Sequence, residues 1–223
     1  MRWVKAHGPA YTVLKVYLEP GESVYAEPGA MLLVRGDVEV ETSSGGILSG
    51  LKRALLGGES FWINRFTAGP GGGEVWLAPG VPGDVEAVEL SGEAWVVQDT
   101  GYLAHYGEVE VSASWRGLRG LLAEGELFWL KVEGRGVVWV SGYGGLETVE
   151  VPAGESLVVD NMHLVAMPAD VDYSIRKFGG LKSFIFGGEG LVVEIRGPAR
   201  VVVQTRVLPP LARLLARFLP RRD

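Results

Sequence analysis

The chain has 223 residues and a net charge of −6; 47% of its residues are hydrophobic and 22% are charged. That composition is ordinary for a globular protein, and an acidic balance without long runs of one sign disfavours nucleic acid as the main partner. The sequence contains no cysteine, which excludes disulfides, thiolate nucleophiles and cysteine-rich metal sites.

The first ten residues, MRWVKAHGPA, contain no apolar core of the kind that a signal peptide needs. Nowhere do about eighteen apolar residues run together, as a membrane-spanning helix would require. We therefore expect a cytoplasmic protein.

Short runs rich in Val, Trp, Tyr and Phe predict β-strands along most of the chain. Examples in chain order are EVWLAP, AWVVQD, GVVWVSGYG and RVVVQTR. Such runs favour strands because β-branched and aromatic side chains suit a pleated sheet. Glycine and proline turns separate them, and glycine reaches 33 of 223 residues, about twice the usual share. This spacing indicates an all-β sandwich or barrel.

Two phrases recur along the sequence. The first reads GLKRALLGGES from Gly50, GLRGLLAEGEL from Gly117 and GLKSFIFGGEG from Gly180. The second precedes each copy of the first and reads GESVYAEPGAMLLV from Gly21, GEAWVVQDTGYLAH from Gly92 and GESLVVDNMHLVAM from Gly154. A true duplication carries its neighbours along, so the two phrases together predict an internal repeat.

The repeat predicts three structural units of about 65 residues, each built largely of strands. The predicted boundaries are 1–79 for the first unit, 80–144 for the second, 145–206 for the third and 207–223 for a tail. A unit of this size buries little apolar surface alone, so we expect the units to cover one another's open faces and sheet edges.

Each phrase contains a Gly-Glu pair, which predicts a tight turn with a positive φ at the glycine and a glutamate in water. We interpret the glutamates as structural rather than as shared acids or bases, because symmetric repeats give them similar environments. They are Glu22, Glu59, Glu93, Glu126, Glu155 and Glu189. Aligning the upstream pairs places Leu32, Leu103 and Val165 in one column.

Six ordered motifs between about Val24 and Arg206 resemble the altered-inheritance-of-mitochondria 24 family, a group of largely unknown function. They are GGILSGLKRALLGGESFWINRF, LAPGVPGDVEAVEL, VVQDTGYLA, VVDNMHLVA, DYSIRKFGGLKS and GEGLVVEIRGPARVVVQTR. The resemblance implies three domains per chain with a fold like that of the tryptophan RNA-binding attenuation protein (TRAP), a short double-stranded β-helix. It also implies a homotrimer that closes a ring of nine domains. Eukaryotic relatives are associated with the mitochondrial inner membrane, but this sequence lacks a transit peptide, and the family brings no established catalytic residue.

The residues themselves offer no constellation typical of an enzyme, so we expect no catalytic residue, metal or cofactor. His7, His105 and His163 lie far apart in the sequence. We interpret His163 as a hydrogen-bonded structural residue and His105 as a surface residue at a strand end. The stretch GPGGGE, from Gly69 to Glu74, lacks the other half of a phosphate-binding loop and is interpreted as a hairpin turn.

Three basic residues occupy one column of the repeat: Lys52, Arg119 and Lys182. In a closed ring they would form a circle of positive charge that could attract an anion, a phospholipid headgroup, an acidic partner or RNA. The simpler interpretation is that they are solvated positions beside strands. We keep them as candidate anion- or partner-binding residues.

Two segments are more apolar than the repeat requires. Near the first, Leu48, Leu51 and Leu55 indicate either an interface plug or a membrane contact. In the tail, Pro210 is placed to begin a helix and Pro220 to end it. Its apolar face has Leu211, Leu214, Leu215 and Phe218, with Arg213 and Arg217 elsewhere on the helix.

Four arginines against one aspartate give this tail a charge of +3, so the rest of the chain carries −9 of the total of −6. A short basic amphipathic helix can dock on the acidic ring or lie on an anionic bilayer. We favour docking on the ring.

The sequence thus predicts a non-enzymatic, ring-forming scaffold or binding module whose main partner is itself. One alternative is a module that binds a membrane surface or anionic lipid through the tail. Another is an RNA-binding ring, and an unrecognised hydrolase or metalloenzyme with a site between domains or chains is a further one. A protein partner is also compatible with the scaffold.

Overall fold

The computed structural model describes residues 1–44, 62–112, 129–177 and 191–219. Strands form nearly all of this part of the chain, as the sequence predicts, with a short 3-10 helix η2 at Asp99–Gly101 and an α-helix α2 at Leu208–Leu215. The strands are β1 (Arg2–Ala6), β2 (Val13–Leu18), β3 (Ser23–Ala26), β4 (Met31–Ser44), β5 (Trp62–Leu77), β6 (Gly83–Gln98), β7 (Tyr102–Ser112), β8 (Trp129–Tyr143), β9 (Leu146–Val151), β10 (Ser156–Asp160), β11 (Leu164–Pro168), β12 (Tyr173–Lys177), β13 (Leu191–Arg196) and β14 (Ala199–Gln204).

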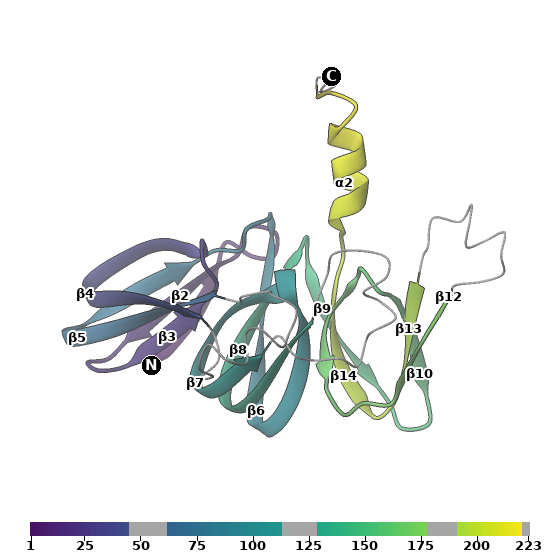
Figure 1. Ribbon diagram of the computed structural model, residues 1–223, viewed down its shortest axis with the longest axis horizontal. Helices are drawn as coiled ribbons and strands as arrows, with labels where there is room; N and C mark the ends of the chain where they lie inside the picture. The colour runs from purple at the N-terminus through teal and green to yellow at the C-terminus, as the bar shows by residue number, and fades with distance from the viewer. Residues whose placement is uncertain (45–61, 113–128, 178–190, 220–223) are drawn as a thin grey trace.

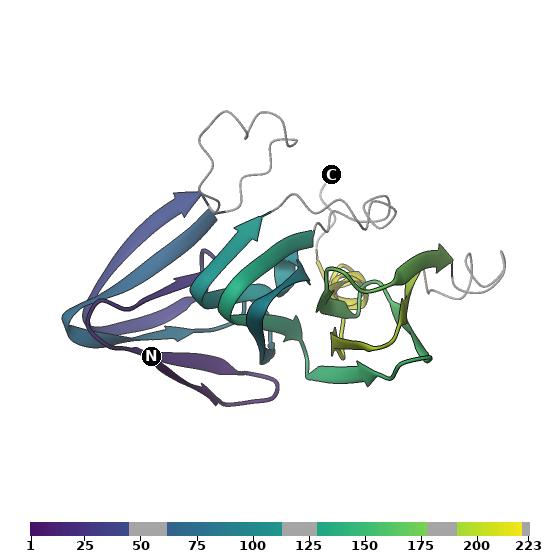
Figure 2. The ribbon, with the colours of Figure 1, turned by 90° about the horizontal axis from the view of Figure 1, so that it is seen from below.

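The strands fall into three groups that follow one another along the long axis of the molecule in both ribbon views (Figures 1 and 2). We call β1–β5 the first group, β6–β8 the second and β9–β14 the third. An antiparallel sheet with the order β1-β2-β5-β3-β7-β8-β6-β11-β14-β9 runs through all three groups, with β4 attached to β5. A smaller sheet, β10-β13-β12, lies within the third group.

A common pairing pattern appears in the three groups. In the first, β5 pairs with β2 and β3 on one edge and with β4 on the other. In the second, β8 pairs in the same way with β6 and β7. In the third, β14 pairs with β9 and β11 while β13 pairs with β10 and β12. One long strand of the first two groups therefore makes the pairings that two shorter strands make in the third.

Glycines allow the long strands to continue where the sequence predicts a turn. The stretch from Gly69 to Glu74 lies inside β5, so its interpretation as a hairpin turn is wrong. Gly73 pairs with Gly36 of β4, where a Cβ on either residue would press on the opposite strand. Because glycine has no side chain, the two backbones can approach closely there and bend together.

The Gly-Glu turns confirm the predicted backbone conformation. Gly21, Gly92 and Gly154 have φ values of 80°, 122° and 85°. The prediction that the glutamate stands in water is wrong for Glu22, whose carboxylate accepts hydrogen bonds from the Tyr106 hydroxyl at 2.8 Å and from the backbone N–H of Glu19 at 2.9 Å. Neighbouring strands fold over this turn, which local sequence does not reveal.

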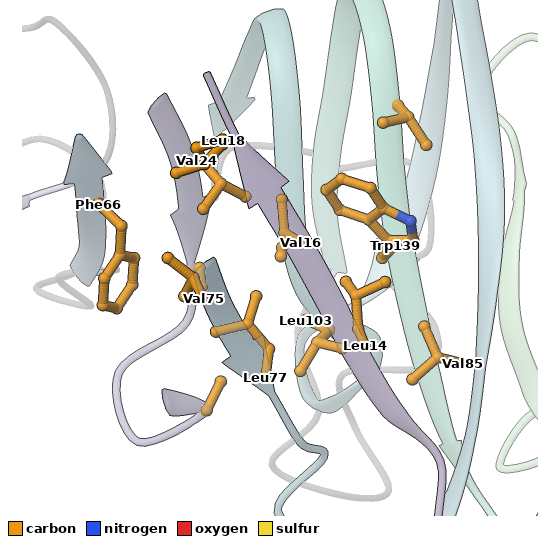
Figure 3. Packing of buried hydrophobic residues seen from close by; sticks show 14 of the residues in the cluster. Leu14, Val16, Leu18, Val24, Phe66, Val75, Leu77, Val85, Leu103 and Trp139 are labelled. Carbon is orange, nitrogen blue, oxygen red and sulfur yellow. The ribbon is translucent and has the colours of Figure 1, made fainter. Parts of the chain in front are cut away.

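The described residues form three apolar clusters, and each draws side chains from more than one group. Figure 3 shows the first cluster, in which Leu14 and Leu77 of the first group pack with Leu103 and Trp139 of the second. All four of these side chains are fully buried. The first group therefore completes its core with residues that the second group supplies.

Helix α2 follows the third group and projects from it (Figure 1), so that Figure 2 looks almost along its axis. It begins at Leu208, slightly before the predicted start, and the α-helical hydrogen bonding ends well before Pro220. None of its residues is buried. Within the described residues no helix is both long and apolar enough to cross a membrane.

Candidate functional site

Two strand pairs join the groups. The first junction pairs β3 with β7, so that Tyr25 lies opposite His105 and Ala26 opposite Ala104. The second junction pairs β6 with β11 in the same antiparallel sense, through the pairs Val97–Ala166, Val96–Met167 and Trp95–Pro168. At both junctions the second strand of one group thus pairs with the strand that follows a short turn in the next group.

Both junctions bury the residues that the later group contributes. Leu103, Ala104 and Trp139 are inaccessible to solvent at the first junction, and the Trp139 ring meets Trp3 edge-on with centroids 5.7 Å apart. The corresponding side chains at the second junction are Val165, Ala166 and Val202, which are also inaccessible. Removing this much apolar surface from water makes each junction a major source of stability.

The first junction also contains a buried pair of polar side chains. The Tyr102 hydroxyl and His105 Nδ1 lie 2.6 Å apart, and the His105 ring stacks on Tyr25 with centroids 4.7 Å apart. Burial lowers the pKa of His105 to about 4 because the charged imidazolium is poorly solvated there. The imidazole is therefore neutral at physiological pH. The prediction that His105 is a surface residue is wrong, since the neighbouring group covers it.

A carboxyl group beside this pair is also perturbed. Burial, and to a lesser degree the charge of Asp99, raise the pKa of Glu27 to about 7. Burial and the Glu27 charge in turn raise the pKa of Tyr102. The backbone N–H of Glu27 donates to the Leu103 carbonyl at 2.9 Å, which holds this residue at the junction.

This ionisable cluster can retain or release a proton near neutral pH, which is a property of many catalytic groups. Its imidazole and phenol, however, are buried at 4% and 0% exposure, so a substrate in solution has no direct contact with them. A catalytic acid or base must come within hydrogen-bond reach of the group on which it acts. The arrangement is therefore better suited to a structural role at the first junction.

Two strands retain an edge that no described residue pairs. Residues 31–35 of β4 pair only with β5, and β10 pairs only with β13. These edges carry three exposed apolar side chains, Met31 at 49%, Leu32 at 53% and Val158 at 39% exposure. An unpaired apolar edge is a ready template for another strand.

The residues selected from the sequence have different outcomes. Lys52, Arg119 and Lys182 lie outside the described residues, as do Leu48, Leu51 and Leu55. His163 is hydrogen-bonded as predicted, since its Nδ1 lies 2.7 Å from the Gln204 carbonyl oxygen. The candidate residues of the tail that lie in or just after α2 are Leu211, Arg213, Leu215, Arg217 and Phe218.

Sequence reasoning missed the ionisable cluster, although one signal for it existed. Glu27, Gln98 and Asp160 each stand five residues after the glutamate of an upstream Gly-Glu pair, so a polar residue recurs at this position between apolar neighbours. Its burial depends on the neighbouring group. Across the described residues, no three His, Asp or Glu side chains are grouped so that they could hold a metal ion.

Comparison with known proteins places the whole chain. The family model for mitochondrial biogenesis AIM24 matches residues 4–206. An uncharacterized protein of Streptococcus pyogenes serotype M6 is 29% identical over 229 residues, which cover 99% of this chain and 92% of that protein. A crystal structure of a protein from Streptococcus pyogenes superposes with a TM-score of 0.78 at 28% identity, covering 98% of this chain and 99% of the other.

Proposed function

Because the chain belongs to the mitochondrial biogenesis AIM24 family, whose relatives described above carry no assigned activity, we propose a function from its strand pairing. The chain acts as a non-enzymatic scaffold that assembles with further copies of itself into a closed ring. The observation that carries this proposal is a junction used twice within the chain, with one half of the same junction left open at each end.

The proposal takes the three groups as three repeated domains of the TRAP-like kind. Three features support this division. Each group has the same pairing pattern, each has a positive-φ glycine before the same glutamate, and each has a register shift at the same place in the ladder. The shifts fall between Met31 and Leu33, Tyr102 and Ala104, and Leu164 and Ala166.

The extra residue at each shift connects the repeat to assembly. Leu103 and Val165 occupy this position at the two junctions and are completely buried. Leu32 occupies it in the first group and is 53% exposed, because no preceding group covers it. Trp76 likewise corresponds to the buried Trp139 but remains partly exposed. The first group therefore presents the surface that buries against a preceding group at both internal junctions.

The third group supplies the complementary half. Its strand β10 corresponds to β3 and to the second half of β6, which are the strands that form the junctions. If β10 of one copy meets β4 of the next in the same register, Val158 pairs with Val34, Val159 with Leu33 and Leu157 with Arg35. Head-to-tail contacts of this kind generate a ring when the rotation closes. Three chains would give the nine domains that the family resemblance implies.

An RNA-binding ring has less support. Single-strand binders need exposed aromatic faces and free cations beside them. Here the Lys15 ammonium lies over the Trp76 ring at 3.7 Å and the Arg2 guanidinium lies over Tyr17 at 4.2 Å. These aromatic faces are already covered by the chain's own cations, and the chain as a whole is acidic.

The first test replaces Leu32 with glutamate. In a separate chain this side chain is exposed, so Leu32→Glu should leave the fold intact. In the ring it would bury an unpaired charge, so we expect the dissociation constant for assembly to rise by about 100-fold or more. Native mass spectrometry should find a trimer for the unmodified chain and a monomer for Leu32→Glu.

Val4→Glu is the matched control, because Val4 is exposed at 38% on β1 and lies on neither open edge. It should assemble like the unmodified chain. A monomeric unmodified chain at micromolar concentration, or a Leu32→Glu variant that still forms the trimer, would overturn the proposal.

The second test checks the register, and the absence of native cysteine makes it clean. Paired residues of antiparallel strands are close enough for a disulfide to form. A Val34→Cys/Val158→Cys variant should therefore oxidise into a ladder that ends at the trimer on a non-reducing gel. Arg35→Cys/Val158→Cys is the control, because a shift of one residue turns the two thiols to opposite faces. Equal ladders from both variants would contradict the register.

A further inference from the structure

We propose that α2 binds the surface of an anionic bilayer, so that the assembled chain is a peripheral membrane scaffold. The tail is the one segment with an amphipathic face that the assembly proposed above does not use. The family model also ends at Arg206, before this helix begins. The binding surface belongs to α2 itself, while its strength rests on the proposed assembly.

The chain holds the base of the helix firmly. The backbone N–H groups of Thr205 and Arg206 donate to the carbonyls of Gly145 and Tyr143 at 2.9 and 3.2 Å, and the Thr205 hydroxyl accepts from the Gly145 N–H at 2.9 Å. Beyond this anchor the helix stands clear of the strands (Figure 1). A fixed base with an uncovered helix presents the helix to a partner outside the chain.

The helix separates apolar from cationic side chains. Arg213 and Arg217 are spaced four residues apart and therefore lie on one face. The opposite face is apolar, and its side chains are 44% exposed at Leu208, 50% at Leu214, 51% at Leu215 and 79% at Phe218. No acidic residue occurs between Val207 and Leu219. A helix with leucine and phenylalanine on one face and arginine on the other is typical of interfacial membrane helices.

The helix is too short to enter the bilayer in any other way. Its eight residues span about 12 Å, whereas the hydrocarbon core of a bilayer is about 30 Å thick. It would therefore lie in the headgroup region with its leucines toward the acyl chains.

The protein surface offers α2 no comparable apolar partner. Apart from α2, the large exposed apolar residues of the described chain include Met31, Leu32 and Val158, which the proposed assembly covers. The others are Val4, Tyr11, Val40 and Trp62, which are distributed over β1, the turn after it and the outer ends of β4 and β5. Attraction to the acidic body would satisfy the arginines but leave the leucines in water. An anionic bilayer satisfies both faces at once.

Assembly makes a weak helix effective. One short helix binds a membrane only marginally, but cyclic symmetry places all copies of α2 at one level on the same side of a ring. Simultaneous binding of several linked modules raises the apparent affinity by about 10²–10⁴-fold. We therefore expect the trimer to bind vesicles much more tightly than a monomer.

The test is flotation of the full chain with vesicles of phosphatidylcholine, with and without about one quarter phosphatidylglycerol. The unmodified chain should float with the anionic vesicles, less as salt increases, because exposed charges are screened. Leu214→Gln/Phe218→Gln should reduce flotation at least tenfold. Val4→Gln/Val40→Gln is the control, because it makes the same chemical change at exposed positions on the body. The control should float like the unmodified chain.

Each outcome separates the two proposals. No flotation of the unmodified chain at low salt, or equal flotation of Leu214→Gln/Phe218→Gln, overturns the membrane proposal. If α2 docks on a neighbouring copy instead, the same variant will weaken the oligomer in the absence of lipid. Failure of the assembly proposal is visible without vesicles, in the mass of the unmodified chain. A monomeric Leu32→Glu variant should float about 100-fold less well than the trimer.

Discussion

The two internal junctions share a backbone arrangement and differ in chemistry. Each pairs two strands in the same antiparallel sense and buries the residue at a register shift, Leu103 in one and Val165 in the other. The first junction adds a tryptophan, a tyrosine–histidine pair and a carboxyl with a raised pKa. The second has Val202, Leu164, Met167 and Gln98 at the corresponding positions. The backbone ladder therefore defines the junction, while the buried side chains can vary.

The difference matters because polar groups in a buried site affect stability through their partners. Apolar side chains contribute by burial alone, whereas a buried carboxyl or imidazole destabilises the fold unless it is neutral or hydrogen-bonded. The first junction should therefore respond to pH in a way that the second does not. The predictions below use Leu32→Glu as the background, so that assembly does not contribute to the measured unfolding.

The largest effect should come from the apolar core of the junctions. Trp139→Ala removes a fully buried indole and should lower the free energy of unfolding by about 3–5 kcal/mol. Val202→Ala, at the corresponding position of the second junction, should cost about 1–3 kcal/mol because fewer buried carbons are lost. Urea denaturation measures both. Equal losses would show that the two junctions do not depend on side-chain volume in the same way.

The next effect should come from Glu27. Its pKa is higher in the folded protein than its ordinary value of 4.5, so the folded state binds a proton more readily than the unfolded state. The stability of the unmodified protein should therefore fall as the pH rises from about 4.5 to about 7 and stay low above that range. Glu27→Gln removes this loss. It should be more stable than its parent by about 2 kcal/mol at pH 8 and nearly equal to it at pH 4.5.

The reciprocal change tests whether the second junction can acquire the same property. Gln98 is 2% exposed, and Gln98→Glu places a carboxyl where burial should raise its pKa. This variant should lose stability above pH 7 and recover part of it near pH 4.5. Glu89→Gln, at an exposed position of β6, is the control that should change neither value. A pH-independent effect of Gln98→Glu would contradict the comparison.

The smallest effect concerns the tyrosine–histidine pair. Tyr102→Phe leaves His105 Nδ1 buried without its partner and should cost about 1–2 kcal/mol. Replacing both partners, as Tyr102→Phe/His105→Phe, should recover much of this loss because no polar group is then stranded. Thermal unfolding at pH 7.5 measures both variants. A double variant as unstable as the single one would mean that the aromatic stack on Tyr25, rather than the hydrogen bond, stabilises the site.

Local sequence was sufficient for several features. Gly21, Gly92 and Gly154 adopt positive φ as predicted, because a turn conformation depends on the residues that form it. The all-β class and the tail helix follow from periodicity, which is also local. The prediction failed at Gly69–Glu74, because a glycine cluster allows either a turn or a close crossing of strands, and only the opposing Gly36 decides between them.

The candidate site depends on more distant contacts. The alignment of the repeat puts Leu32, Leu103 and Val165 in one column, yet the first is exposed and the other two are buried. The pKa shifts of Glu27 and His105 likewise arise from residues of a neighbouring group. The sequence by itself determined which residues recur and which turns they form. Tertiary structure alone decided which of those residues are buried, because burial depends on whether another group lies against them.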